Sequence, residues 1–185
     1  MDTSVQMTLP TLPLQSAALV PLAPEHAASL QHHADDELVW RNLFEGFPRP
    51  YTLADAEAWC GGGWKAAGHV WGIAVKDEVI GCIGVRQDAG WLRCNAEVGY
   101  WIGRPYWGQG IATQALRAAA DWTFANLDEV TRLYAPIFDW NQASQAVASQ
   151  AGLALEGRMP FSAIKAGRVI GRVVHARYRS RLTGP

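Results

Sequence analysis

The order of apolar and polar positions predicts strands and helices along most of the chain. Apolar runs with the length of β-strands, bounded by turn residues, lie at 17–22, 70–75, 79–85, 91–102, 133–138, 153–161 and 168–179. Helical spacing or capping residues mark the segments 24–33, 35–44, 52 to 59 or 65, 113–126 and 141–152. The helix from 113 is the clearest, because Ile111, Ala115, Ala118 and Trp122 recur at intervals of four and three residues.

Single residues support several of these boundaries. Pro24 suits the first turn of a helix, and Thr52 with Asp55 resembles a capping box. Asn141 is a suitable N-cap, and Gly152 fits the position just after the end of the same helix.

The resulting order of elements predicts an α+β (mixed α/β) fold with a strand–helix–strand crossover over residues 97–138 at its centre. We expect residues 1–15 to form a flexible N-terminal tail and residues 16–182 to form a single domain. The sequence carries no internal repeat and no low-complexity block.

Composition narrows the function classes. With 49% hydrophobic and 18% charged residues, the 185-residue chain is typical of a globular protein, and its net charge of −1 gives no field that would recruit nucleic acid or a membrane. The 3 cysteines form no CxxC pair, which favours a reducing compartment and no metal site. No signal peptide and no apolar run of about 20 residues is visible, so we expect a cytoplasmic protein.

The segment 97–113 carries the most chemistry. A strand ends near Ile102, and Gly108 and Gly110 then precede a helix. The first N–H groups of a helix lack intrahelical acceptors and lie at its positive end, so glycines there let a phosphate or pyrophosphate approach. A dinucleotide fingerprint would need glycine where Thr113 stands, and no Gly-Lys-Ser/Thr tripeptide exists for a P-loop. A tight turn without a ligand is the remaining alternative.

Residues 107–112 resemble motif A of the GNAT (GCN5-related) acetyltransferases, which is arginine or glutamine followed by Gly-x-Gly-x-Gly/Ala. The match begins at the second position, because Trp107 replaces the basic or amide residue. Asn141 and Gly152 match a second family block, in which Leu153 replaces phenylalanine. Residues 24–27 and 55–59 look like the ribosomal-protein N-acetyltransferase (RimJ/RimL-like) branch, and the resemblance covers about residues 17–180.

This resemblance implies the acyl-CoA N-acyltransferase fold, a mixed twisted sheet of about seven strands flanked by helices. It implies acetyl-CoA as cosubstrate and no metal. The residues that it assigns to cofactor binding are Tyr100, Trp101, Ile102, Trp107, Gly108, Gln109, Gly110, Ile111, Ala112, Thr113, Asn141 and Ser144.

Two residues are candidates for catalysis. Alternation places Glu97 on one strand face with Gly99 and Trp101, where apolar neighbours would make a carboxylate a stronger base; a solvent-facing residue is the alternative. The tyrosine that protonates the CoA thiolate in many family members is replaced by Ala148. In the RimL-like branch a serine lies near the thiol instead, and Ser144 matches it, as acid or as hydrogen-bond partner; a small polar residue without a role is the alternative.

The resemblance implies direct attack of a primary amine on acetyl-CoA in a ternary complex, and its branch favours a protein N-terminal α-amine as acceptor. Acetylation of a small amine (a polyamine, amino acid or amine antibiotic), non-catalytic acyl-CoA binding and a nucleotide-phosphate module are the alternatives. We expect partners to be acetyl-CoA and the acceptor, without nucleic acid or membrane, and the sequence leaves a homodimer open.

The acceptor pocket is expected from residues 30–65 and 158–172. The tryptophans expected to line it are Trp40, Trp59, Trp64 and Trp101. Arginines expected on an outer strand face and tail, with a contact to the CoA 3′-phosphate or an acidic substrate as the alternative, are Arg168, Arg172, Arg177, Arg179 and Arg181. We expect His175 and the three cysteines, Cys60, Cys82 and Cys94, to have no catalytic role.

Overall fold

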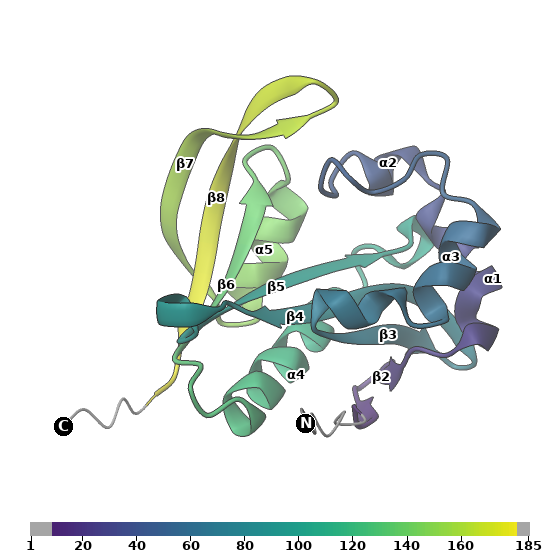
Figure 1. The fold of residues 1–185 in the computed structure, drawn as a ribbon, viewed down its shortest axis with the longest axis horizontal. Coiled ribbons are helices and arrows are strands. Elements are labelled where there is room, and N and C mark those ends of the chain that lie inside the picture. Colours follow the sequence, from purple (N-terminus) through teal and green to yellow (C-terminus); the bar gives the residue numbers. More distant parts are fainter. Residues whose placement is uncertain (1–8, 181–185) are drawn as a thin grey trace.

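The structure, a computed structural model, describes residues 9–180, which form one eight-stranded sheet with helices on both faces (Figure 1). The sheet order is β1-β2-β3-β4-β5-β6-β8-β7. The strands are β1 Leu12–Pro13, β2 Ala18–Pro21, β3 His69–Val75, β4 Glu78–Gln87, β5 Asn95–Ile102, β6 Arg132–Phe138, β7 Ala154–Lys165 and β8 Arg168–Tyr178. Neighbouring strands are antiparallel except β5 and β6, which are parallel and joined by a helix.

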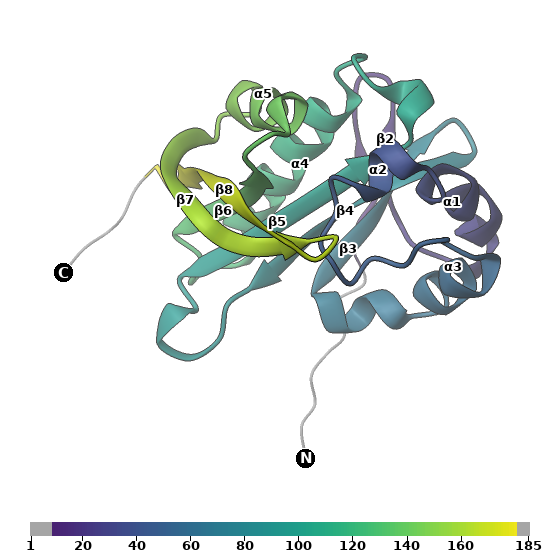
Figure 2. The ribbon, with the colours of Figure 1, turned by 90° about the horizontal axis from the view of Figure 1, so that it is seen from above.

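The helices form two groups, seen from above in Figure 2. The α-helices are α1 Ala27–Ala34, α2 Glu37–Trp40, α3 Leu53–Cys60, α4 Ile111–Asn126 and α5 Gln142–Gln150. The short 3-10 helices are η1 Pro24–His26, η2 Gly63–Ala67, η3 Gly90–Leu92 and η4 Arg104–Tyr106. Helices α4 and α5 pack on one face of the sheet, and α1 and α3 pack on the other.

Each face of the sheet carries its own core. Trp71 is fully buried against the α4 side, where it packs edge-on against Trp122 at 4.8 Å between ring centroids. The preceding residue, Val70, belongs to the other core, with Leu30 of α1 and Ala56 of α3. Successive strand residues therefore alternate between two apolar environments, which explains why β3 and β4 are apolar at nearly every position.

The parallel pair separates soon after it forms. Strands β5 and β6 are in register at Asn95–Arg132, Ala96–Leu133 and Glu97–Tyr134 only. Beyond this point β5 continues to Ile102 beside β4, while β6 continues to Phe138 beside β8. Figure 1 shows the two strands diverging, with the β7–β8 hairpin rising on the β6 side. Within residues 9–180, the main-chain groups of residues 98–102 that point away from β4 therefore have no strand partner.

The sequence predicted most of these elements and several of their caps. Thr52 Oγ1 accepts a hydrogen bond from Asp55 N at 3.2 Å, and Asp55 Oδ2 accepts one from Thr52 N at 2.8 Å, so the capping box is confirmed. Asn141 Oδ1 accepts from Ser144 N at 3.1 Å, and Gly152 has a φ of +92° just after α5. Both ends of this helix are therefore as predicted.

Several boundaries differ from the prediction; β7, for example, continues to Lys165 instead of ending at residue 161. Helix α2 spans only Glu37–Trp40, and β5 begins at Asn95 because η3 occupies the residues before it. Residues 9–15, predicted as tail, add the short strand β1 to the sheet; Leu9 is buried, and the carbonyl of Pro10 accepts a hydrogen bond from the indole of Trp71 at 3.0 Å. The rest of the predicted tail, residues 1–8, and positions 181–182 of the predicted domain lie outside the described residues.

Candidate active site

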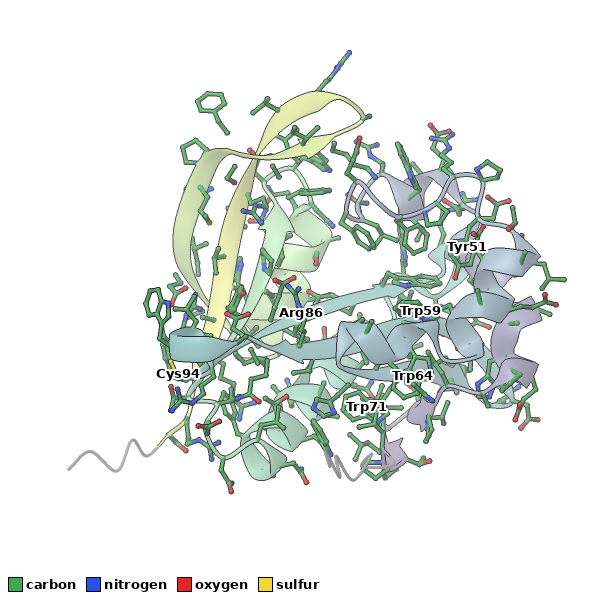
Figure 3. The ribbon with its side chains drawn as sticks, viewed as in Figure 1. Tyr51, Trp59, Trp64, Trp71, Arg86 and Cys94 are labelled. Carbon is green, nitrogen blue, oxygen red and sulfur yellow. The ribbon has the colours of Figure 1, made fainter. Side chains whose placement is uncertain are left out.

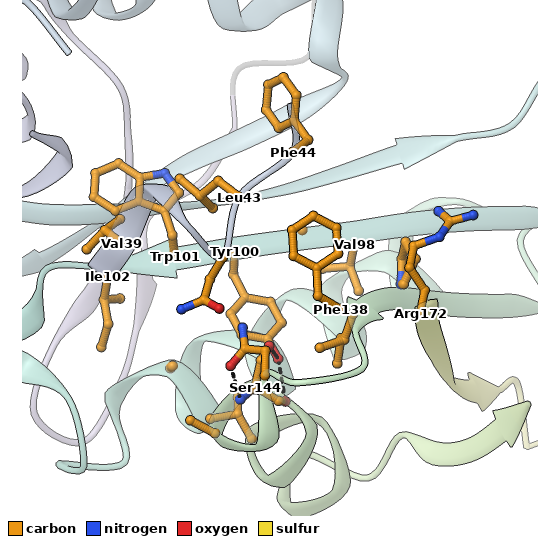
Figure 4. A pocket seen from close by; sticks show the side chains of 18 of the residues that line it. Val39, Leu43, Phe44, Val98, Tyr100, Trp101, Ile102, Phe138, Ser144 and Arg172 are labelled. Carbon is orange, nitrogen blue, oxygen red and sulfur yellow. Dashed lines mark hydrogen bonds between the residues drawn. The ribbon is translucent and has the colours of Figure 1, made fainter. Parts of the chain in front are cut away.

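A cavity of about 430 Å³ lies where β5 and β6 separate. Its walls come from six segments: the end of β5, the end of β6, the start of α5, the glycine loop before α4, α2 with the loop after it, and the β7–β8 hairpin (Figure 4). Sequence-predicted residues that line it are Glu97, Tyr100, Trp101, Ile102, Trp107, Gly108, Ala112, Asn141 and Ser144. Gln109, Gly110, Ile111 and Thr113 complete the loop and the first turn of α4 without lining the cavity.

The glycine loop leaves the N-terminus of α4 open. Gly108 and Gly110 have φ values of +74° and +75°, a left-handed conformation that favours glycine. A Cβ atom added at either glycine would meet no atom within 4 Å. Gly110 is the N-cap of the 16-residue helix and provides no side-chain cap, so the first N–H groups of α4 are available to an anion.

The other side chains of this loop are hydrogen-bonded to nearby main-chain carbonyls. The indole N–H of Trp107 donates to the carbonyl of Ile102 at 2.8 Å, and the Gln109 amide donates to the carbonyl of Pro105 at 2.9 Å. Trp107, which replaces the basic residue of the motif, thus ties the loop to the end of β5. Contacts to an anion here would come from main-chain N–H groups.

A tyrosine spans the gap between β5 and α5. Ser144 Oγ donates to the Tyr100 hydroxyl at 2.9 Å, and that hydroxyl donates to the main-chain carbonyl of Ser144 at 3.0 Å (Figure 4). Burial raises the pKa of Tyr100 to about 12, so its phenol stays neutral at physiological pH. Ser144 is fixed from the other side by the Asn141 cap. Ala148, one turn further along α5, is fully buried and offers no hydroxyl.

Glu97 lies at the closed end of the gap, in polar surroundings. Its Oε2 atom is 3.1 Å from Arg86 Nη2 and 3.5 Å from the Tyr134 hydroxyl, which also lies 3.3 Å from Asp88. Burial and the negative charges of Glu97 and Asp88 raise the pKa of Tyr134 to about 12. The expected apolar surroundings of Glu97 were wrong, because Arg86 stands directly opposite it on β4. The cross-strand register of the β4–β5 pair was the signal that could have found Arg86.

The predicted alternation along β5 is correct. Glu97 and Trp101 lie on the face towards α2 and α3, where Trp101 meets Phe47 edge-on at 6.1 Å. Tyr100, on the other face, points towards α5. The two faces of this one strand therefore supply different parts of the cavity.

The loop after α2 and the tip of the β7–β8 hairpin meet across the cavity. Lys165 Nζ lies 3.6 Å from the ring centroid of Trp40, and Arg49 lies 4.8 Å from the same ring. The main-chain N–H of Ala166 donates to Glu45 Oε2 at 2.8 Å. Burial lowers the pKa of Lys165. These contacts connect two segments that are 121 residues apart in the sequence.

Three of the four tryptophans predicted for the acceptor pocket do not line the cavity. Trp40 is held by the cations just described, and Trp59 and Trp64 pack on the core below α3, at the end of the sheet opposite Cys94 (Figure 3). Of these four tryptophans, only Trp101 lines the cavity. Trp59 and Trp64 are large apolar side chains that help to bury α3 against the sheet, and they do not line the cavity.

The arginines near the C-terminus also differ from one another. Arg172 lines the cavity instead of decorating an outer face. Arg177 pairs with an aspartate of α4 at 2.8 Å, and Arg179 donates to three main-chain carbonyls in the last turn of α4 and the loop after it. Arg168 is exposed. Arg181 lies outside the described residues.

The remaining reactive side chains lie away from the cavity. His175 is buried with no hydrogen-bond partner at Nδ1 among residues 9–180. Burial raises the pKa of Cys82 to about 12 and that of Cys60 to about 11, and Cys94 is exposed. Over residues 9–180, no group of three or more His, Cys, Asp or Glu side chains is arranged to hold a metal ion. The helices of this part of the chain are all too short or too polar to span a bilayer.

Comparison with known proteins agrees with this geometry. The family model described as an acetyltransferase (GNAT) domain matches residues 17–154. The ribosomal-protein-serine acetyltransferase of Escherichia coli (strain K12) is 37% identical over 85 residues, which cover 46% of this chain and 46% of that protein. The chain spans about half the length of the curated relatives it matches.

Solved structures share the fold over nearly all of the chain. RimJ of Mycobacterium smegmatis, in complex with CoA-disulfide, has a TM-score of 0.80 at 21% identity and covers 100% of this chain and 93% of its own. RimL, a ribosomal L7/L12 α-N-protein acetyltransferase in complex with coenzyme A, has a TM-score of 0.77 at 22% identity, covering 91% and 98%. At these identities the likeness establishes the fold.

Proposed function

Because the chain belongs to the GNAT acetyltransferase family, we propose that it transfers an acetyl group from acetyl-CoA to the N-terminal α-amine of a protein. The observation that carries this proposal is the edge of β5 over residues 98–102, which has no strand partner within residues 9–180 and lies in the same cavity as the start of α4. One long ligand with a pyrophosphate and a thioester would use both features.

The glycine loop would hold the pyrophosphate of acetyl-CoA. Gly108 and Gly110 leave open space in front of the first N–H groups of α4. A phosphate at this position gains from free donors and from the helix dipole. The RimJ and RimL structures contain coenzyme A or its disulfide, which supports the same class of ligand for this fold.

The acetyl group would then lie beside β5. Main-chain N–H groups of residues 98–102 would donate to the thioester carbonyl oxygen and stabilise the negative charge that develops as the amine attacks. A preorganised donor of this kind contributes roughly 3 kcal/mol to the transition state. The Ser144 hydroxyl, near the edge of the same gap, would hydrogen-bond to the sulfur.

The reaction has one bond-forming and one bond-breaking event. The neutral amine attacks the thioester carbon, the tetrahedral intermediate collapses, and the C–S bond breaks to release CoA thiolate. Glu97, directly or through water, would accept the proton that the amine loses. The thiolate would collect a proton from water or through the Ser144 hydroxyl.

The name of the E. coli relative supports a protein acceptor, as does the name of RimL. We test the proposal by CoA thiol release with acetyl-CoA and a panel of short peptides that differ in their first residue, beside polyamines, free amino acids and amine antibiotics. Acetylation of peptides at the α-amine, located by fragment mass spectrometry, supports a protein acceptor. Turnover with small amines alone would contradict a protein acceptor and indicate a small-amine acetyltransferase. Binding of acetyl-CoA without any turnover would indicate a non-catalytic acyl-CoA binding protein.

A further inference from the structure

Arg172 presents an un-neutralised cation to the acceptor side of the cavity. It lies on β8 opposite Phe138 of β6, and both line the cavity. Figure 4 shows Arg172 beside Phe138 and Val98, at the opposite end of the cavity from Trp101 and Ile102. Among residues 9–180 its guanidinium forms no ion pair; it donates from Nε to the Ser162 hydroxyl at 3.1 Å.

The two carboxylates that line the cavity, Glu45 and Glu97, have contacts other than Arg172. Glu97 pairs with Arg86, and Glu45 accepts a hydrogen bond from the main chain of Ala166. Glu156, the acidic residue of the β7–β8 hairpin, accepts a hydrogen bond from Arg132. Among residues 9–180 no carboxylate forms an ion pair with Arg172, and the Ser162 hydroxyl accepts from one of the five donors of its guanidinium.

We propose that Arg172 binds an acidic side chain of the acceptor polypeptide, close to its reacting N-terminal amine. The inference rests on the proposed function and adds a substrate class to it: proteins with Asp or Glu near the N-terminus. Guanidinium–carboxylate contacts are among the strongest and most directional hydrogen bonds in proteins, which makes this position suited to discriminating between acceptors.

The register of the strands sets the distance. Tyr134, whose hydroxyl lies beside Glu97, and Phe138, the partner of Arg172, are on the same face of β6 and four residues apart, or roughly 13 Å along the strand. An extended peptide covers roughly 3.3–3.6 Å per residue. An acidic side chain at the second to fourth residue of the acceptor is therefore within reach of Arg172.

The test compares peptides that differ only in charge. Peptides that begin with serine and carry Glu, Gln or Lys at positions 2 to 4 are offered as substrates to the wild-type protein and to the Arg172→Gln, Arg172→Glu and Arg158→Gln variants. Arg158 is the matched control, because it is an exposed arginine of β7 opposite Val173 and its side chain lies on the other sheet face from Arg172.

We expect wild-type kcat/KM to be about tenfold or more higher for the Glu peptide than for the Gln peptide, since charged hydrogen bonds are worth more than about one tenfold step in affinity. Arg172→Gln should bring that ratio close to one, mainly through KM, Arg172→Glu should prefer the Lys peptide, and Arg158→Gln should keep the wild-type ratio. An inverted preference in Arg172→Glu would show that residue 172 recognises the charge of the peptide. Loss of a structural contact with Ser162 could not produce it, because reversing the charge does not restore that contact.

Four results would overturn the inference. Peptide acetylation with no charge preference, or a preference that survives in Arg172→Gln, refutes it while leaving the proposed function intact. Acetylation of free amino acids that depends on Arg172 would assign the guanidinium to the acceptor's own α-carboxylate instead. If the wild-type protein acetylates no peptide, the protein acceptor and this inference fail together.

Discussion

Tyr100 and Ser144 exchange two hydrogen bonds across the gap between β5 and α5, one with the serine hydroxyl and one with its main-chain carbonyl. This contact holds the start of α5 at a fixed distance from the unpaired edge of β5. The Ser144 hydroxyl donates its hydrogen bond to the Tyr100 phenol. A ligand sulfur would therefore meet a serine whose orientation is set by Tyr100.

The first prediction concerns this pair. Ser144→Ala should lower kcat by about tenfold with little change in the affinity for acetyl-CoA, because a single neutral hydrogen bond is worth about 1 kcal/mol and a hydroxyl is a weak acid. Tyr100→Phe should lower the free energy of unfolding by about 1–2 kcal/mol, since it leaves the Ser144 carbonyl without its donor. Steady-state kinetics and urea unfolding measure these effects. An unchanged kcat in Ser144→Ala would remove the serine from the chemistry.

The second prediction concerns the glycine loop. Acetyl-CoA at about 100 times its Kd should stabilise the protein by roughly 2.7 kcal/mol. Gly110→Leu should abolish this shift, because the added side chain fills the open space before α4, while costing about 1–2 kcal/mol of backbone strain at a φ of +75°. Gly90→Leu is the matched control, with a φ of +62°, open space around the added Cβ and a position outside the cavity. A ligand shift that survives in Gly110→Leu would contradict the phosphate site.

Much of the fold was predictable because its signals are local. Apolar runs and capping residues depend on neighbours within one turn, as at Thr52, Asp55 and Asn141. Strand β1 was missed because two residues with a proline carry no periodic pattern. Its place depends on a contact between the Pro10 carbonyl and Trp71, 61 residues away, which no local pattern encodes.

The third prediction concerns Glu97. If it is the base, Glu97→Gln should lower kcat by about 10²–10⁴ and remove or shift the acidic limb of the pH–rate profile, with acetyl-CoA affinity nearly unchanged. The Gln side chain keeps the shape of the site and can still accept a hydrogen bond from Arg86. Glu129→Gln breaks a comparable exposed ion pair with Arg93 away from the cavity and should leave kcat unchanged. Wild-type activity in Glu97→Gln would assign the proton to water.

The fourth prediction concerns acid stability. Hydrogen bonding from the Arg132 guanidinium, with a further contribution from Tyr178, lowers the pKa of Glu156 from 4.5 to about 2. A carboxyl whose pKa is lower in the folded protein than in the unfolded chain stabilises the fold at any pH above the unfolded pKa. This stabilisation is lost as the pH falls from 4.5 towards 2. Glu156→Gln should therefore cost about 1 kcal/mol at pH 7, a modest value because the pair is partly exposed. The difference from wild type, measured by urea unfolding, should shrink below pH 4.5; a constant difference would contradict the assigned ion pair.

The site was predictable only in part, for a different reason. The glycine loop and Asn141 lie at the two helix starts that the sequence predicted, because capping residues and glycines mark helix starts locally; their roles in binding stay a prediction. The surroundings of Glu97 and the cation of Arg172 depend on strands that meet from distant parts of the chain, as in the Arg86–Glu97 and Phe138–Arg172 pairs. Such pairs can be predicted only when the register of the two strands is known, and the sequence alone does not give the register of β8 against β6.

The last prediction is that acetyl transfer is direct and forms no acetyl-cysteine. No cysteine lines the cavity: Cys60 and Cys82 are buried in the core below α1 and α3, and Cys94 is exposed at the far end of the sheet (Figure 3). The raised pKa values of Cys82 and Cys60, about 12 and 11, keep both thiols protonated near neutral pH, and the thiolate is the nucleophilic form. A Cys→Ala substitution at all three positions should therefore retain kcat, at a stability cost of about 1 kcal/mol for each buried site, and initial-rate plots should intersect as for a ternary complex. Parallel plots, or a cysteine-dependent mass gain of one acetyl group that disappears when amine is added, would establish a covalent intermediate instead.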